Sequence, residues 1–180
     1  MEQHRWRTLT ASVATILLGL VFFVSGTGKV FINLPEETEY IDQLIPAFFI
    51  TPTTAYFIGY GLPWIELALG ILLLIGFGPR LLSALSIPLV LAFIANNVWM
   101  ISRGMEEFPQ CAQCFGRWEE LLGAMTPVQS LSIDVVLIAL TLVVIFLYPG
   151  SFFSSRPWLA NLGKKKQNQP NNQQVRKETD

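Results

Sequence analysis

Residues Leu9–Val24, LTASVATILLGLVFFV, contain no charged residue, and the apolar segment continues toward Phe31. At a rise of about 1.5 Å per residue, a helix over 9–31 is long enough to cross a hydrocarbon layer of roughly 30 Å. Three further apolar segments lie at about 54–77, 81–102 and 128–148, and the first and the last of these each contain one carboxylate. The sequence therefore predicts an all-α membrane protein built on a bundle of four transmembrane helices.

The composition favours the same class. Hydrophobic residues make up 52% of the chain and charged residues only 14%, whereas about 25% of the residues of a soluble domain are charged. The mean hydropathy is +0.46. Because no basic stripe is interleaved with aromatic residues in a soluble domain, nucleic-acid binding is excluded. The lipid bilayer is the first expected partner.

Two segments outside the four spans have a distinct composition. Residues 33–53 are acidic, and Pro35 and Pro46 suit the start and the stop of a short helix. We expect that helix to lie at the membrane interface. Residues 159–180 are basic and then rich in Gln and Asn, so they predict a disordered tail. The transmembrane domain is thus expected over 9–158.

The distribution of basic residues predicts the orientation in the membrane. With a cytoplasmic amino terminus, nine bases lie inside and three outside. The inner set is Arg5, Arg7, Arg80, Arg156, Lys164, Lys165, Lys166, Arg176 and Lys177, and the outer set is Lys29, Arg103 and Arg117. By the positive-inside rule, residues 1–8 and the tail are cytoplasmic, and residues 103–127, the cysteine loop, are extracytoplasmic. We expect a multi-pass protein of the cell (cytoplasmic) membrane.

The cysteine loop carries the strongest chemical signal. Cys111 and Cys114 are the only two cysteines and form a Cys-x-x-Cys motif. A disulfide between them closes a small ring, so the pair can cycle between dithiol and disulfide. The alternative is a static disulfide that holds the loop. No metal is expected, because tetrahedral zinc needs four ligands and the only histidine, His4, is predicted on the other side of the membrane.

Polar residues within the predicted spans form a second candidate group. Lys29, Glu66 and Asp134 are charged residues in or at the end of a span, and Asn96 and Asn97 lie late in the third span. A charge at the centre of a membrane helix costs about 2.5–3.5 kcal/mol on insertion scales, so each should face the bundle interior and find a partner. We expect Lys29 to pair with Glu66 or Asp134. These groups could equally serve only to hold helices together.

Three motifs carry a resemblance to a known family. They are Ser25-Gly-Thr-Gly-Lys29, the stretch Glu66-Leu-Ala-Leu-Gly70 with its turn Gly76-Phe-Gly-Pro-Arg80, and Cys111-Ala-Gln-Cys-Phe-Gly116. Together they resemble the DoxX/MauE superfamily of four-helix membrane proteins, over about residues 10–150. The cysteine motif before the last span is the more specific, and it favours the MauE branch.

The resemblance implies a redox-associated membrane protein. MauE proteins are needed for disulfide formation in a periplasmic methylamine dehydrogenase subunit, and DoxX relatives suggest a subunit linked to quinone and sulfur-compound oxidation. The resemblance makes Cys111 and Cys114 the candidate reactive groups. The residues expected to support them are Lys29, Glu66, Asn96, Asn97, Arg117 and Asp134.

The leading interpretation is thiol–disulfide exchange with an extracytoplasmic thioredoxin-like or substrate protein, in which one thiolate attacks a disulfide and a mixed disulfide forms. Electrons would then pass to a quinone, the one cofactor expected. The activity would be of the thiol–disulfide oxidoreductase type. The alternative is a non-enzymatic subunit or scaffold of a respiratory or sulfur- or methylamine-oxidising complex, with a structural disulfide.

Overall fold

A computed structural model gives the fold, and it describes residues 2–30, 51–104, 106, 115, 118, 123 and 125–148. The elements in these ranges are α1 (Glu2–Val30), α3 (Pro52–Ile75), α4 (Pro79–Ser102) and α6 (Pro127–Leu147). All four are long and apolar enough to cross a membrane. The predicted all-α fold with four transmembrane helices is therefore confirmed. Both the tail at 159–180 and residues 31–50, where the interfacial helix was expected, lie outside the described residues.

Local sequence explains where α3 begins and ends. The Thr51 side chain accepts a hydrogen bond from the Thr54 amide at 3.3 Å, and Pro52 follows in the first turn. This cap starts α3 at Pro52, slightly before the predicted start at 54. At the other end Gly76 adopts φ 81° and Gly78 φ 48°, left-handed values that suit glycine. The predicted tight turn into α4 is thus present.

The start of α6 is fixed by a capping box. Thr126 Oγ1 accepts a hydrogen bond from the Gln129 amide at 3.3 Å, and Gln129 Oε1 accepts one from the Thr126 amide at 3.0 Å. Pro127 occupies the first turn, where its missing amide hydrogen costs nothing. The cap fixes the point at which the cysteine loop enters the bundle. It also places Ser130 and Asp134 in the first two turns of α6.

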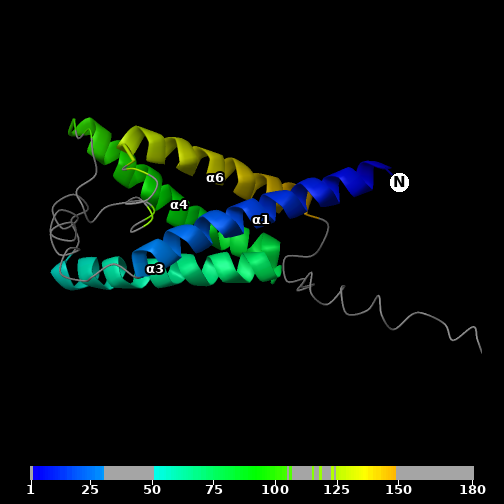
Figure 1. Cartoon of the computed structure of the whole chain (residues 1–180), viewed down its shortest axis with the longest axis horizontal. Coiled ribbons are helices and arrows are strands. Elements are labelled where there is room, and N and C mark those ends of the chain that lie inside the picture. Colours follow the sequence, from blue (N-terminus) through cyan, green and yellow to red (C-terminus); the bar gives the residue numbers. More distant parts are fainter. Residues whose placement is uncertain are drawn as a thin grey trace, which may run out of the picture.

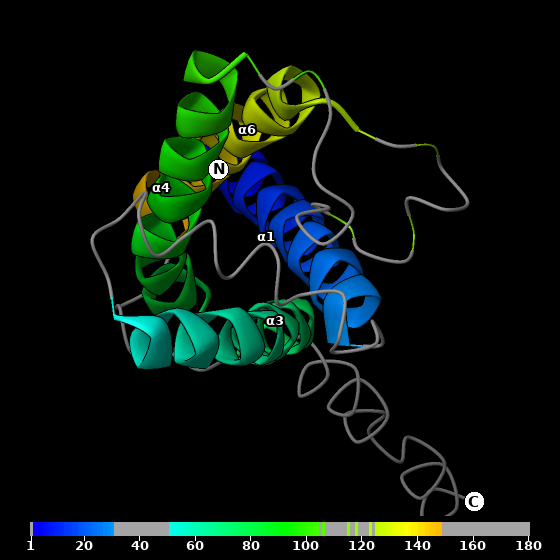
Figure 2. The ribbon, with the colours of Figure 1, turned by 90° about the vertical axis from the view of Figure 1, so that its left-hand side faces the viewer.

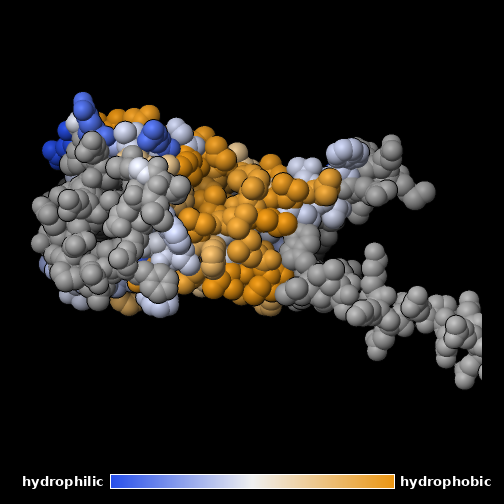
Figure 3. All heavy atoms as spheres, viewed as in Figure 1, coloured by the Kyte–Doolittle hydropathy of each residue, from blue (hydrophilic) through white to orange (hydrophobic). Residues whose placement is uncertain are grey.

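The four helices form an elongated bundle (Figure 1). Helix α1 packs against α3 and α6, and α4 packs against α6. Although a short turn joins them, α3 and α4 diverge when the bundle is viewed from its end (Figure 2). On the face shown in Figure 3, apolar residues form a band across the middle of the molecule, and hydrophilic residues gather at the far end of α4. This band is the surface that lipid would cover.

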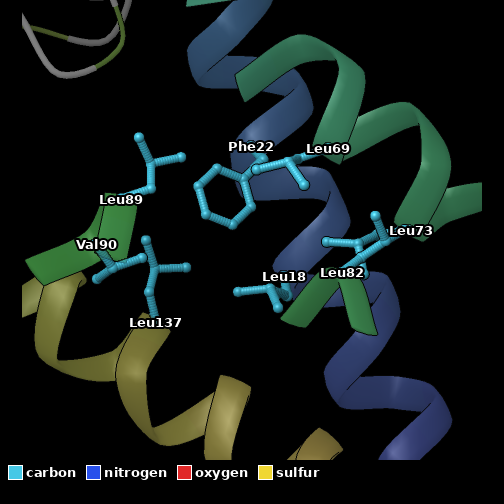
Figure 4. Close-up of a cluster of buried hydrophobic side chains, with 8 residues drawn as sticks. All are labelled: Leu18, Phe22, Leu69, Leu73, Leu82, Leu89, Val90 and Leu137. Atoms are coloured by element: carbon cyan, nitrogen blue, oxygen red, sulfur yellow. The ribbon is translucent and has the colours of Figure 1, made fainter. Parts of the chain in front are cut away.

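The apolar core draws on all four helices (Figure 4). Leu18 and Phe22 of α1 meet side chains from each of the other helices in one buried cluster. The remaining members are Leu69, Leu73, Leu82, Leu89, Val90 and Leu137. Because lipid is itself apolar, this cluster is held by close packing rather than by exclusion of water.

Glycines allow α1 and α3 to approach closely. A Cβ atom at Gly26 would lie 2.5 Å from the Leu67 amide nitrogen, and one at Gly70 would lie 2.7 Å from Phe23 Cα. Both distances are far below van der Waals contact, so neither position has room for a side chain. Small residues at such crossings are typical of membrane helix pairs. The close approach brings the last turns of α1 against the middle of α3.

Candidate functional site

A buried ion pair joins α1 and α3. Lys29 Nζ lies 2.7 Å from Glu66 Oε1 and 3.0 Å from Glu66 Oε2. The Ser25 hydroxyl donates a third hydrogen bond to Glu66 Oε2 at 2.6 Å. The Glu66 side chain is fully buried, whereas that of Lys29 is 18% exposed. The sequence predicted that Lys29 pairs with Glu66 or Asp134. In the structure its partner is Glu66.

The helix geometry explains why these three side chains meet. Ser25 and Lys29 are four residues apart in α1 and therefore share one face of the helix. Gly26 lies against the backbone of Leu67, the residue after Glu66, so that face is pressed onto α3. The Lys29 ammonium also lies 4.9 Å from the centre of the Phe93 ring of α4. A single lysine thus connects α1, α3 and α4.

A second polar cluster joins α4 and α6. Asn97 Nδ2 donates to Asp134 Oδ2 at 2.7 Å and to Ser130 Oγ at 2.9 Å. All three residues are buried. Ser130 and Asp134 are four residues apart on α6 and so face Asn97 together. The two clusters are neighbours, because Phe93, which contacts Lys29, and Asn97 are four residues apart on α4 and share one face of that helix. Together they form one polar region.

Asn96 does not join this cluster through any described contact. Its Nδ2 atom lies 3.9 Å from the Met100 sulfur on its own helix. Successive residues of a helix point in different directions, so only one of the two adjacent asparagines can face Ser130 and Asp134. The Oδ1 atoms of Asn96 and Asn97 are both buried without a hydrogen-bond partner in the described part of the chain.

The cysteine loop is described only at a few positions. Cys111, Cys114 and Arg117 lie outside the described residues, whereas Phe115 and Trp118 are described. The Trp118 indole Nε1 donates to Thr27 Oγ1 at 3.3 Å. A Cβ atom at Gly28 would overlap the Phe115 carbonyl oxygen and lie 2.6 Å from Trp118 Cδ1. The loop therefore touches the last turn of α1, directly beside Lys29.

Sequence reasoning missed several of the residues that build this region. Ser130 was not singled out, although its spacing of four from Asp134 predicts a shared helix face. Neither Trp118 nor its acceptor Thr27 was expected to take part. Their contact joins residues 91 positions apart, so no local pattern could have signalled it.

A family model described as Methylamine utilisation protein MauE matches residues 7–147, which span all four helices. The match ends within the last turn of α6 and includes the entire cysteine loop. No match was found among curated proteins or among solved structures. The chain is thus a multi-pass membrane protein, and one family model covers most of its length.

Proposed function

This chain belongs to the MauE family, and from that premise we propose that it exchanges disulfides with an extracytoplasmic partner protein through Cys111 and Cys114. The observation that carries the proposal is the contact of Phe115 and Trp118 with Thr27 and Gly28 of α1. Cys114 directly precedes Phe115 in the sequence, and Phe115 contacts the last turn of α1 beside Lys29.

The exchange uses only the chemistry of sulfur. A thiolate of the partner attacks one sulfur of the Cys111–Cys114 disulfide, a mixed disulfide forms, and the other cysteine leaves as a thiolate that takes up a proton. A second partner thiolate then attacks the mixed disulfide and releases the reduced pair. The partner loses two electrons and the pair gains them, so the step balances. The reverse direction has the same steps.

We propose a quinone as the acceptor that reoxidises the pair. When bound, a quinone supplies a two-electron, two-proton sink. The residues that would hold it are Lys29, Asn97 and Asp134, whereas Asn96, expected from the sequence to join them, makes its described contact to Met100 on its own helix. Lys29 and Asn97 fit the group because the Lys29 ammonium can donate to a quinone carbonyl oxygen, and the buried Oδ1 atom of Asn97 can accept from a hydroxyl group of the reduced quinol. Glu66 and Ser25 fix the lysine by their hydrogen bonds.

The second candidate is a scaffold subunit whose disulfide is structural. The hydrogen bond between Trp118 and Thr27 favours it equally, because a fixed loop is also what a static disulfide would support. A cycling pair and a structural pair differ in one testable way. Only the cycling pair passes through a covalent complex with another protein.

Cys114→Ala is expected to accumulate a mixed disulfide with the partner in cells. In the reverse direction of the exchange, the remaining Cys111 thiolate attacks a disulfide of the partner and one partner sulfur leaves as a thiolate, but no Cys114 thiolate is left to attack the mixed disulfide and release the partner. We expect Cys111 to be the partner-facing sulfur, since Cys114 is next to Phe115 and so nearer the bundle. The adduct would be seen as a higher band on a non-reducing gel and would vanish on reduction.

The variant that lacks both cysteines is the matched control and should give no adduct. The scaffold function predicts a different result. Each single variant and the double variant would then lose the same small amount of stability, because each opens the same short ring. If neither single variant traps a partner while the wild-type pair stays oxidised in mild reductant, the proposed exchange is wrong.

The proposed function also requires the cysteine loop to face the outside. A membrane-impermeant maleimide should therefore label Cys111 and Cys114 in intact cells after mild reduction. In a cysteine-free background, Phe77→Cys provides the opposite control, because Phe77 is 50% exposed in the turn between α3 and α4. That residue should react only after lysis. If the native cysteine pair is labelled only after lysis, the predicted orientation in the membrane is wrong.

A further inference from the structure

We propose that the last turn of α1 is the docking site of the cysteine loop, and that Gly28 is a positioning residue for the reactive pair. The docking site consists of Thr27 and Gly28, and the docked residues are Phe115 and Trp118. The inference rests on the proposed function in one respect only, namely that docking serves to position Cys111 and Cys114 for disulfide exchange. The docking itself stands on contacts between described residues.

The two docked residues are also joined to each other. The Trp118 amide donates a hydrogen bond to the Phe115 carbonyl oxygen at 3.2 Å. That same carbonyl oxygen rests against Gly28, and the Trp118 indole donates to Thr27 Oγ1 at 3.3 Å. The Trp118 side chain remains 41% exposed, so it covers the helix with part of its surface only. One backbone group and one side chain of the loop thus meet two adjacent residues of α1.

Gly28 is the residue that makes this contact possible. Any Cβ atom there would overlap a backbone oxygen, which cannot turn aside as the end of a flexible side chain can. Glycine is also one of the poorest helix formers, so helix formation does not explain its place in the last turn of α1. Gly61 of α3 provides the contrast, because a Cβ atom there meets nothing within 4 Å in the described part of the chain.

The docking site connects the loop to the buried ion pair through the backbone of α1. Thr27 and Gly28 bind the loop, and the next residue, Lys29, is held by Glu66. Cys114 precedes Phe115, and adjacent Cα atoms are about 3.8 Å apart, so a docked Phe115 limits how far Cys114 can move from α1. Cys111 is three residues before Cys114 in the sequence, so covalent geometry sets a looser limit on its distance from α1. Docking would therefore assign Cys114 to the membrane side and Cys111 to the partner.

The test compares Gly28→Ala with Gly61→Ala in the full-length protein in detergent. Two properties are measured on each variant: the rate at which the reduced cysteines react with an impermeant maleimide, and the reduction potential of the pair in glutathione buffers. Gly28→Ala is expected to raise the labelling rate about fivefold or more, the factor that corresponds to losing one ordinary hydrogen bond. It should also shift the potential. Gly61→Ala should leave both unchanged.

A second variant guards against a general loss of folding. Trp118→Phe keeps the aromatic ring but removes the donor to Thr27, and it should raise the labelling rate in the same direction by a smaller factor. Equal labelling rates and potentials in Gly28→Ala, Trp118→Phe and Gly61→Ala would overturn the docking site. Changed labelling in Gly28→Ala together with no trapped partner in either Cys111→Ala or Cys114→Ala would support the docking site and reject the proposed function.

Discussion

Lys29→Met is expected to lower the free energy of unfolding by about 3–5 kcal/mol, because it leaves a carboxylate buried without its counter-charge. Glu66 is fully buried, and of its two described partners only the Ser25 hydroxyl would remain. A hydroxyl can donate a hydrogen bond but cannot neutralise the charge. Unfolding in detergent, followed by tryptophan fluorescence or circular dichroism, would measure the loss.

Glu66→Gln and the double variant complete the cycle. The double variant should be more stable than the sum of the two single losses predicts, because no unpaired charge then remains in the bundle. Arg7→Met is the matched control, since it removes an exposed basic residue from the same helix and should change stability by only about 0.5 kcal/mol. Additive losses across the cycle would mean that Lys29 and Glu66 do not depend on each other.

The sequence was sufficient to predict an ion pair, because the reason for one is the presence of charged residues within apolar helices. A charged residue in an apolar helix must find a partner, and Lys29, Glu66 and Asp134 were the candidates in the four spans. The sequence could not decide whether Glu66 or Asp134 is the partner of Lys29. The choice depends on how closely α1 approaches α3, and that is set by Gly26 and Gly70 in the packed structure.

The rest of the region depends on contacts that local patterns do not encode. Asn96 and Asn97 are equivalent by composition, and only the rotation of α4 against α6 decides that Asn97 binds Asp134. Trp118 donates to Thr27, which lies 91 positions earlier in the sequence, so no local pattern predicts the contact. Helical periodicity thus predicts the spans, whereas helix rotation and loop docking follow only from tertiary packing.

Gly70→Ala is expected to separate α1 from α3 and to destabilise the bundle by about 1–3 kcal/mol, the usual cost of overpacking. The added Cβ atom would overlap the Phe23 backbone nitrogen and lie 2.7 Å from Phe23 Cα and 3.0 Å from the Gly19 carbonyl oxygen. These are backbone atoms of α1, so one helix must move. Because Glu66 lies one turn before Gly70, the same movement would lengthen its hydrogen bonds to Ser25 and Lys29.

The matched control for this prediction is Gly61→Ala on the same helix. Its Cβ atom meets nothing within 4 Å among the described residues, and alanine is the better helix former by about 1 kcal/mol. Gly61→Ala should therefore leave the unfolding free energy unchanged or raise it, while Gly70→Ala lowers it, although the two substitutions are chemically identical. The difference isolates the close approach of α1 to α3, because helix propensity favours alanine at both positions. If both variants have the same free energy of unfolding, Gly70 does not determine the contact between α1 and α3. It would then not determine the contact between Lys29 and Glu66 either.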